Sequence, residues 1–245
     1  MITLDKINKS FSGKNPILKN VSFNISKGES VVIIGQSGVG KSVLLKHINR
    51  LLKPDSGKVM IDDILLNNLP YKDLQNVRRK MAMVFQFGAL FDSMNIEENI
   101  LLGLKNIKDL KLADMLNKVE NSLDLVNLSG INHKMPSEIS GGMKKRVGIA
   151  RAIAMDPEYI LYDEPTTGLD PITTDRINLL IKKVSEKRKV TSVLVTHNMR
   201  TLKKVANKVI MLHEGNIIFN GNVDELYSTK DKFIRYFING EKNGE

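Results

Sequence analysis

The chain contains no cysteine and no tryptophan. The absence of cysteine excludes disulfide bonds, thiolate catalysis and cysteine-ligated zinc. Aromatic residues make up only 5% of the 245 residues, and no apolar run approaches the length of a membrane span. The N-terminal segment, MITLDKINKSFS, lacks the apolar region of a signal peptide. We therefore expect a protein of a reducing compartment that reaches a membrane only through a partner or through its surface.

The rest of the composition is that of a globular α/β domain with room for a small inserted subdomain. Apolar residues make up 42% of the chain and charged residues 26%, which argues against extensive disorder. The formal net charge of +10 permits a nucleic acid or an anionic membrane as a partner. The basic residues are scattered along the chain and not gathered in one block, however, so we attribute the charge to a general drift toward lysine, asparagine and isoleucine.

Four short apolar runs each end abruptly in polar residues. They are SVVIIG before Gln36, KMAMVF before Gln86, YILY before Asp163 and TSVLV before Thr196. Such runs are typical of strands buried on both faces of a parallel sheet. The helical patterns KSVLLKHINRLL and TTDRINLLIKKVSEKR lie between them. The sequence therefore predicts a doubly wound α/β sheet, in which the four polar ends meet in one crevice.

The segment from about Asn95 to Pro136 has a helical pattern and no run that resembles a strand. Its stretch LADMLNKVENSLDLV places five apolar residues at helical spacing on one face. They are Leu112, Met115, Leu116, Val119 and Leu123. We expect this segment to form a helical subdomain inserted into the α/β core. Near the end of the chain, HEGNIIFNGNVDEL predicts a hairpin followed by a helix.

The stretch GQSGVGKS, from Gly35 to Ser42, fits the phosphate-loop pattern G-x-x-x-x-G-K-[ST] between a predicted strand and a predicted helix. The glycines let backbone N–H groups converge on phosphates, and the helix N-terminus adds a favourable dipole. Lys41 would neutralise the β- and γ-phosphates, and Ser42 would offer its hydroxyl to Mg²⁺. The alternative is a glycine-rich turn that ends in Lys-Ser by chance. The pattern predicts nucleotide binding.

Polar side chains at the ends of two other predicted strands suit nucleotide hydrolysis. Asp163 would contact Mg²⁺, and Glu164, directly after it, can orient and deprotonate an attacking water. The alternative is a carboxylate pair that only caps the next helix. His197 follows the TSVLV run, where it would face the γ-phosphate unless it is a structural histidine.

The stretch EISGGMKKR, from Glu138 to Arg146, resembles a second phosphate cradle. Two glycines follow a serine and open onto a basic helical pattern. This stretch has no phosphate-loop lysine of its own, and one domain should need only one cradle.

The ordered set of motifs resembles the ATP-binding subunit of an ABC transporter. GQSGVGKS matches the Walker A motif, and ILYDE matches Walker B with its catalytic glutamate. Gln86 matches the Q-loop glutamine, GLD ending at Asp170 matches the D-loop, and His197 matches the switch histidine. Phe11 lies where the family stacks an aromatic ring on adenine, although tyrosine is commoner there.

The stretch ISGGM matches the family signature, usually written LSGGQ. Ile139 replaces the leucine and Met143 replaces the glutamine, which puts the finer hydrogen bonding of the signature in question. The phosphate-facing residues Ser140, Gly141 and Gly142 are retained. In this family the signature of one subunit closes over the ATP held by Walker A of another. The resemblance therefore assigns the second cradle to the ATP of a partner, and implies a second copy of the chain in a head-to-tail dimer.

The resemblance implies one ABC ATPase domain over residues 1–245. Its fold is the P-loop ABC ATPase fold of class α/β, with a RecA-like core, a mostly parallel sheet, an N-terminal antiparallel β portion and an inserted helical subdomain. We expect the core at 1–87 and 152–245 and the helical subdomain at about 88–151.

The resemblance also implies ATP and Mg²⁺ as cofactors and assigns residues to them. The catalytic residues are Glu164, His197 and Gln86. The Mg²⁺ ligands are Ser42, Gln86 and Asp163. The residues that bind the nucleotide are Phe11, Gly35, Gln36, Ser37, Gly38, Val39, Gly40, Lys41, Ser42, Val43, Ser140, Gly141, Gly142 and Asp170.

A membrane partner and a substrate class are further expectations from the resemblance. The family docks an integral membrane permease at about Phe87–Asn99, which places the chain on the cytoplasmic face of the inner membrane or an organellar equivalent. The stretches FQFGALFDSMNIEENI and ARAIAMDPEYILYDEPTTGLDP look like those of the Mla-type (MlaF family) phospholipid-transport ATPases. That likeness implies lipid transport and a lipid-binding substrate protein in the complex.

Several alternatives remain open. One is that the apolar residues of the FQFGALF segment only pack the helical subdomain. Another is an amino-acid importer, although such importers usually have a longer polar stretch there and SALDP in the D-loop. A lipoprotein-release or cell-division complex, or an ABC ATPase outside transport, would also carry these motifs. We do not expect nucleic acid as a partner, since the motifs supply no base-reading element.

Overall fold

The computed structural model describes residues 1–11, 16–105, 107 and 109–239. The chain forms two compact units. The first comprises Met1–Leu69 and Val193–Glu245, and the second comprises Pro70–Ser192. Among the described residues, no helix is both long enough and apolar enough to cross a membrane.

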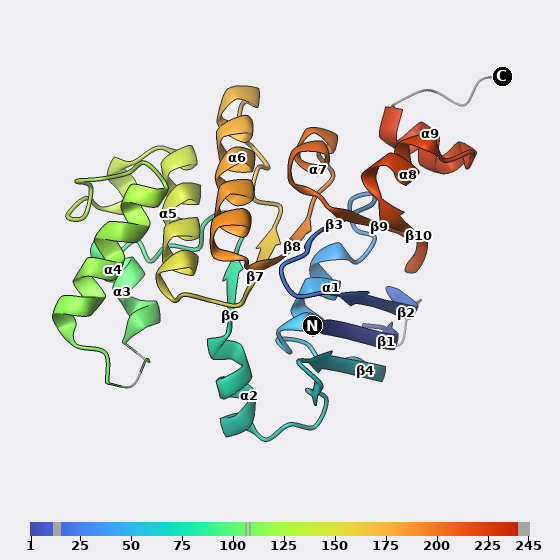
Figure 1. Cartoon of the computed structure of the whole chain (residues 1–245), viewed down its shortest axis with the longest axis horizontal. Helices are drawn as coiled ribbons and strands as arrows, with labels where there is room; N and C mark the ends of the chain where they lie inside the picture. Colours follow the sequence, from blue (N-terminus) through green and yellow to red (C-terminus); the bar gives the residue numbers. More distant parts are fainter. Residues whose placement is uncertain (12–15, 106, 108, 240–245) are drawn as a thin grey trace. The chain divides into compact units, whose positions relative to one another are not determined.

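The first unit contains an antiparallel sheet of four strands in the order β2-β1-β4-β5. Figure 1 shows β2, β1 and β4 side by side. Along β2 the side chains of Val21, Phe23 and Ile25 are buried and alternate with exposed ones, as expected for a sheet with one covered face. Helix α1 (Lys41–Ile48) contacts β4. The strands of this sheet are β1 (Ile2–Lys9), β2 (Leu18–Ile25), β4 (Ser56–Ile61) and β5 (Ile64–Leu65).

The first unit also contains the parallel strands that carry the phosphate loop. Every residue of β3 (Ser30–Ile34) is buried, as its apolar sequence predicts. Strand β9 (Lys208–His213) pairs with it in parallel, and β10 (Asn216–Asn222) pairs antiparallel with β9. The end of β8 (Thr191–Val195) lies on the other side of β3. The remaining helices of this unit are α7 (Met199–Val205), α8 (Val223–Ser228) and α9 (Lys232–Asn239).

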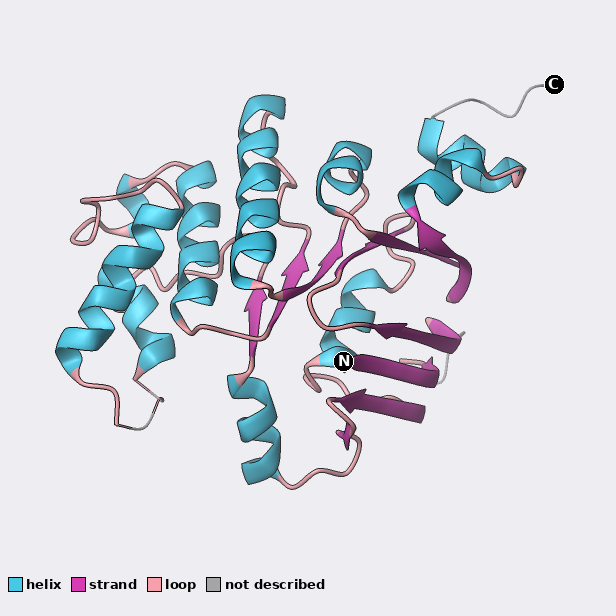
Figure 2. Cartoon of the chain, viewed as in Figure 1, coloured by secondary structure: helices cyan, strands magenta, loops and turns pink. Residues whose placement is uncertain are grey.

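The second unit is mostly helical, as Figure 2 shows, with β6 (Met81–Val84) and β7 (Tyr159–Asp163) as parallel neighbours. Val84 lies opposite Tyr162 in this pair, so the two strands end at the same edge. Helix α2 (Tyr71–Arg79) precedes β6. Helix α6 (Pro171–Arg188) comes after β7 and begins with Pro171 at its first position, where a missing N–H does no harm.

Helices α3 (Ile96–Leu104), α4 (Leu112–Leu125) and α5 (Gly141–Ala154) pack against one another in the second unit (Figure 1). A short 3₁₀ helix, η1 (Pro136–Glu138), precedes α5. Of the apolar face predicted for α4, Val119 and Leu123 are buried, whereas Leu112 at the helix start is 65% exposed. The limits predicted for the helical subdomain, about 88–151, stay a prediction.

The predicted strands are all present, but one predicted helix is shorter than expected. The pattern KSVLLKHINRLL predicts a helix through Leu52, whereas α1 ends at Ile48. Arg50 adopts a left-handed conformation, with φ 57°. A non-glycine residue in that conformation cannot continue an α-helix, so the chain turns away although the apolar spacing continues.

Candidate nucleotide site

The loop between β3 and α1 depends on glycine at two positions. Gly35 has a φ of +152°, and a Cβ there would lie 2.3 Å from the carbonyl oxygen of Leu212. Gly40 has a φ of +105°, and its Cβ would lie 2.9 Å from the side chain of Ile17. Any side chain would therefore collide with neighbouring strands. A cradle of backbone N–H groups needs this close packing and these conformations.

Lys41 lies across the loop that precedes it. Its side chain is only 6% exposed, and its Nζ donates hydrogen bonds to the carbonyl oxygens of Gly35 and Gln36, both at 2.9 Å. The lysine at the end of the phosphate-loop pattern is thus held over the loop by the loop's own backbone. This arrangement places the ammonium group of Lys41 beside the position at which an anion would bind in the cradle.

The N-terminus of α1 suits phosphate for a second reason. Gly40 is the N-cap, and no side chain caps the helix. The first N–H groups of a helix have no partners within the helix, and they attract anions. A Cβ on Gly38 would meet no atom within 4 Å, so a ligand can approach the loop at this residue. The donor set fits the phosphates of a nucleotide, and Ser42, the second residue of α1, adds a hydroxyl.

Two more of the predicted site residues lie in the first unit. The N–H of Thr196 donates to the carbonyl of Ile33 at 3.1 Å, which ties the end of β8 to β3. His197 is exposed. Because it directly follows Thr196, it lies near the same strand edge as Gly35. Phe11 is 41% exposed, and the Nζ of Lys9 lies 5.4 Å from the centre of its ring. The unit thus brings together the polar ends of β3 and β8.

The second unit brings together the other two polar ends. Gln86 comes shortly after β6 and is half-buried, while Asp163 is the last residue of β7 and is buried. Glu164 comes next, with a left-handed φ of 47°. Because β6 and β7 are parallel neighbours, Gln86 and the carboxylates lie at the same edge of the pair. The prediction that all four strand ends share one crevice stays a prediction.

The signature residues Ser140, Gly141 and Gly142 form the start of α5. Ser140 is the N-cap, and its Oγ accepts a hydrogen bond from the N–H of Met143 at 3.3 Å. Ser140 and Gly141 are exposed, and a Cβ on Gly141 would meet no atom within 4 Å. A Cβ on Gly142 would lie 3.0 Å from the side chain of Thr173, at the start of α6. This second helix N-terminus therefore faces open space, as a cradle for an outside anion requires.

Asp170 also has a structural role that the D-loop motif does not indicate. It is the N-cap of α6, and its Oδ1 accepts hydrogen bonds from the N–H groups of Ile172 at 3.0 Å and Thr173 at 2.9 Å. Hydrogen bonds from Thr173, side chain and backbone, hold the pKa of Asp170 below its ordinary value, with Ile172 adding to the effect. An ionised aspartate at this position also complements the helix dipole.

The segment after Gln86 exposes aromatic side chains. Phe87 is 79% exposed and Phe91 is 51% exposed, whereas Leu90 and Met94 are half-buried. Arg151 of α5 anchors this segment, because its guanidinium donates to the carbonyls of Gly88 and Ala89, both at 2.8 Å. Burial lowers the pKa of Arg151.

Sequence reasoning missed three residues that position these segments, Asn99, Arg151 and Lys145. Each acts through contacts with backbone carbonyls, and a single asparagine or basic residue in a helix carries no motif. It also missed a groove of about 690 Å³ beside α2, which is lined by Tyr71, Gln75, Arg78, Arg79, Gly103, Ile107 and Met155. The only signal was the row of polar residues in YKDLQNVRRK.

The loop between β3 and α1 and the carboxylates that end β7 define the class of the protein. It is an α/β phosphate-loop nucleotide-binding protein. The ABC transporter family matches residues 18–167.

Named relatives match almost the whole chain. The probable ribonucleotide transport ATP-binding protein mkl of Mycobacterium leprae (strain TN) is 37% identical over 99% of this chain and 70% of its own length. The methionine import ATP-binding protein MetN of Haemophilus influenzae (strain 86-028NP) is 39% identical over 97% of this chain and 70% of its own length.

Solved structures agree with the fold. The ATP-binding cassette MJ0796, as a dimer in a post-hydrolysis state bound to ADP and Pi, has a TM-score of 0.83 at 34% identity and covers 91% of this chain and 99% of its own. The cassette cbiO1 from Clostridium perfringens, part of the ABC transporter complex cbiONQ, has a TM-score of 0.85 at 29% identity, covering 96% and 93%.

The chain therefore belongs to the ABC transporter ATP-binding family. It is an ATPase whose hydrolysis of ATP is coupled to transport, and its cofactors are ATP and Mg²⁺. The predicted P-loop ABC ATPase fold, with its parallel and antiparallel sheets, is confirmed.

Proposed function

We propose that the chain is the motor subunit of a membrane transporter and that the residues named by its motifs do the chemistry. Lys41 and the N–H groups from Gly35 to Val43 would hold the phosphates, and Phe11 would stack on adenine. Glu164 would take a proton from the water that attacks the γ-phosphate, and His197 would contact that phosphate. The buried Lys41 and the uncapped start of α1 support the assignment of the phosphates.

Mg²⁺ is assigned to Ser42, Gln86 and Asp163. The ion would supply positive charge that offsets the negative charge developing on the phosphates during hydrolysis. Mg²⁺ is usually bound through one or two carboxylates, and phosphate oxygens and water fill much of the rest of its shell. A serine hydroxyl, an amide oxygen and a single aspartate fit that preference, and within the described part of the chain no cluster of three or more His, Cys, Asp or Glu residues builds a larger cage.

A second copy of the chain is part of this proposal. The chain has one phosphate loop and one signature, and the start of α5 exposes Ser140 and Gly141 without a nucleotide loop of its own. In a head-to-tail pair, each signature would close over the ATP that the other copy holds, with Asp170 near the shared boundary. The cassette MJ0796, at 34% identity, is described as a dimer, which supports such a pairing.

A permease contact at Phe87–Asn99 would place the motor at the membrane. This part of the proposal rests on the exposure of Phe87 and Phe91. The backbone of their segment is fixed by hydrogen bonds to the side chains of Asn99 and Arg151. Exposed aromatic residues on a rigid support commonly mark a partner site. The motor would then lie on the cytoplasmic face of the inner membrane, or on an organellar equivalent, bound through its permease.

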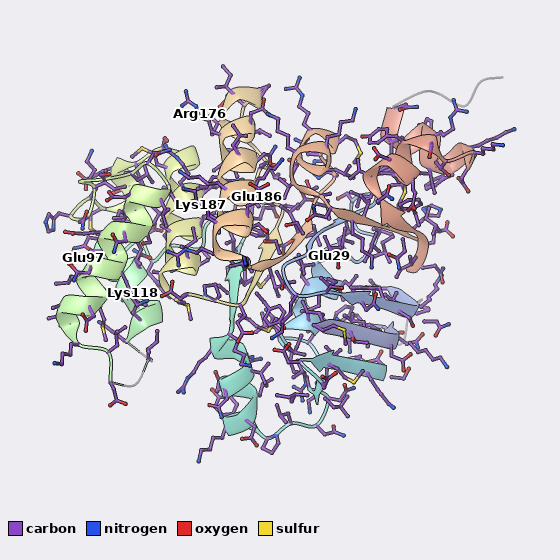
Figure 3. All side chains as sticks on the ribbon, in the orientation of Figure 1. Glu29, Glu97, Lys118, Arg176, Glu186 and Lys187 are labelled. Carbon is purple, nitrogen blue, oxygen red and sulfur yellow. The ribbon has the colours of Figure 1, made fainter. Side chains whose placement is uncertain are left out.

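Nucleic acid is a less suitable partner for the helices of the second unit. Figure 3 shows acidic Glu97 and Glu186 interspersed with basic Lys118, Arg176 and Lys187 on the helices of the second unit. A nucleic-acid site needs a continuous basic stripe. At these five positions both signs of charge occur instead.

Phospholipids or related lipids are our proposed substrates, delivered by a lipid-binding protein of the complex. The proposal rests on the likeness of FQFGALFDSMNIEENI to the Mla-type motors and on GLDP in place of SALDP. A second candidate is amino-acid import, which is favoured by the 39% identity to a protein named for methionine import. Another relative is named for ribonucleotide transport, so the relatives do not agree on a substrate.

Purification of the tagged chain with its membrane partner tests the proposal. The complex is extracted in detergent, its subunits are identified by mass spectrometry, and it is reconstituted into liposomes. We expect ATP-dependent movement of a fluorescent phospholipid, and no ATP-dependent movement of radiolabelled methionine. A complex with the Glu164→Gln chain is the matched control, because it should bind ATP and hydrolyse it about two to four orders of magnitude more slowly.

Two results would contradict parts of this proposal. ATP-dependent methionine uptake without lipid movement would favour the importer. If no integral membrane protein accompanies the chain, the motor function itself is wrong.

A further inference from the structure

Glu164 adopts a backbone conformation that its residue type disfavours. Its φ is 47°, in the left-handed region, where a non-glycine residue loses about 1–2 kcal/mol. Such a conformation persists only where the surroundings hold it. The groups that hold Glu164 therefore determine where its carboxylate lies.

Thr167 holds Glu164 from within the turn after β7. The N–H of Thr167 donates to the carbonyl of Glu164 at 3.3 Å, and its Oγ1 donates to the Oε2 of Glu164 at 3.1 Å. One hydrogen bond fixes the backbone and the other fixes the side chain. The orientation of the carboxylate thus depends on the position of Thr167.

Lys145 of α5 in turn holds Thr167. Its Nζ donates a hydrogen bond to the carbonyl oxygen of Thr167, 22 residues away along the chain. Lys145 is only 7% exposed. Burial lowers its pKa, and the nearby negative charge of Glu164 acts in the opposite direction. A buried lysine is unfavourable unless its hydrogen bonds are made, so this contact is a specific one.

Lys145 lies on the helix that begins with the signature residues. Ser140, Gly141 and Gly142 form the first turn of α5, and Lys145 lies one turn further along the same helix. One helix therefore connects the start of the signature to the turn that carries Glu164. Through Lys145 and Thr167, the position of α5 is linked to the position of the Glu164 carboxylate.

We propose that Lys145 is a positioning residue that holds Glu164, through Thr167, in the orientation needed for hydrolysis. This inference rests on the proposed function, in which Glu164 is the general base. Lys145 does not touch the nucleotide in this scheme. Its loss should lower the rate of hydrolysis and leave ATP binding unchanged.

Substitutions at Lys145 test the inference in the full-length chain. Lys145→Met keeps the length and removes the donor, so we expect kcat to fall about ten- to a hundredfold, as for other small misplacements of a catalytic group. The KM for ATP should stay near the wild-type value. Lys145→Arg keeps a donor and should restore most of the rate. Lys144→Met, the neighbouring lysine on α5, is the matched control and should leave kcat within about twofold.

A pair of substitutions at Thr167 checks the same path independently. Thr167→Val removes the hydroxyl that contacts Glu164, whereas Thr167→Ser retains it. We expect kcat to fall for valine and to stay high for serine. This pair keeps the inference testable even if Lys145→Met fails to fold.

The double variant Lys145→Met with Glu164→Gln separates the inference from the proposed function. If Lys145 acts through Glu164, the double variant should be no slower than Glu164→Gln alone. An equal slowing by Lys145→Met in the wild-type and Glu164→Gln backgrounds would overturn the inference. An unchanged kcat in Lys145→Met, together with a strongly reduced kcat in Glu164→Gln, would also overturn it. Hydrolysis by Glu164→Gln at the wild-type rate would instead overturn the assignment of the base.

Discussion

Asn99 binds the main chain of Phe91 at both of its polar groups. Its Oδ1 accepts a hydrogen bond from the Phe91 N–H at 2.7 Å, and its Nδ2 donates to the Phe91 carbonyl at 3.0 Å. The same Nδ2 lies 2.9 Å from the carbonyl of Met94. Asn99 is fully buried, whereas Phe91 is half exposed. A core residue thus fixes the backbone of the segment that presents an aromatic ring to solvent.

Replacing Asn99 with leucine should destabilise the protein. The two side chains have a similar size, but leucine leaves the N–H of Phe91 without its partner. The carbonyl of Phe91 loses one of its two donors and keeps the N–H of Met94. We expect the free energy of unfolding to fall by about 1–3 kcal/mol, measured by urea denaturation. Asn121→Leu, at an exposed position of α4, is the control and should change it by less than about 0.5 kcal/mol. Equal stability of the two variants would show that the contacts of Asn99 contribute nothing.

Phe91→Glu tests the proposed permease contact. A charge in place of an exposed ring should leave the fold and ATP binding nearly intact, and it should abolish co-purification with the membrane partner, because an apolar anchor is lost and a charge becomes buried. The measurement is the yield of the permease from detergent-solubilised membranes, with ATP affinity determined in parallel. Leu112→Glu, at another exposed apolar position, is the control. If Phe91→Glu keeps the permease, the docking site lies elsewhere.

Lys41→Ala should abolish ATP hydrolysis and weaken ATP binding. Its ammonium group would donate charged hydrogen bonds to the phosphates of ATP, and such bonds are worth about 1.5–3 kcal/mol each, or about ten- to a hundredfold in affinity. Titration with a fluorescent ATP analogue gives the affinity, and phosphate release gives the rate. Lys46→Ala, further along α1, should leave both near wild type. Undiminished turnover by a folded Lys41→Ala protein would remove the phosphate site from this loop.

The sequence predicted the phosphate loop because its chemistry is local. Gly35 and Gly40 have to be glycine for reasons of φ and close contact, and Lys41 comes directly after them, so a short pattern carries the whole arrangement. The strands before it and before Asp163 were predictable because burial on both faces requires continuous apolar runs.

The supports of the site were not predictable in the same way. Lys145 and Asn99 act on backbone carbonyls, and any segment of the chain offers carbonyls. Only the folded chain shows which carbonyl a buried donor meets. The early end of α1 was not predictable either. It coincides with the left-handed conformation of Arg50 in the turn after the helix, and the spacing of apolar residues does not reveal that conformation.

Mixing two inactive variants tests whether the signature acts on the ATP of a second copy. Ser140→Arg fills the space before α5 with a large side chain, so it should block hydrolysis without abolishing ATP binding. When Ser140→Arg subunits are mixed with Lys41→Ala subunits, the intact phosphate loop of the first can meet the intact signature of the second. We expect ATPase activity to return in the mixture, measured as phosphate release after subunit exchange.

The control mixes wild type with a chain that carries both substitutions. It contains the same substitutions in each mixed dimer, but no mixed dimer has a composite site with both parts intact. After correction for wild-type homodimers, recovery in the first mixture and none in the control would support the head-to-tail pair. Activity in the mixed dimers of the control, with none in the first mixture, would show that each chain completes its own site.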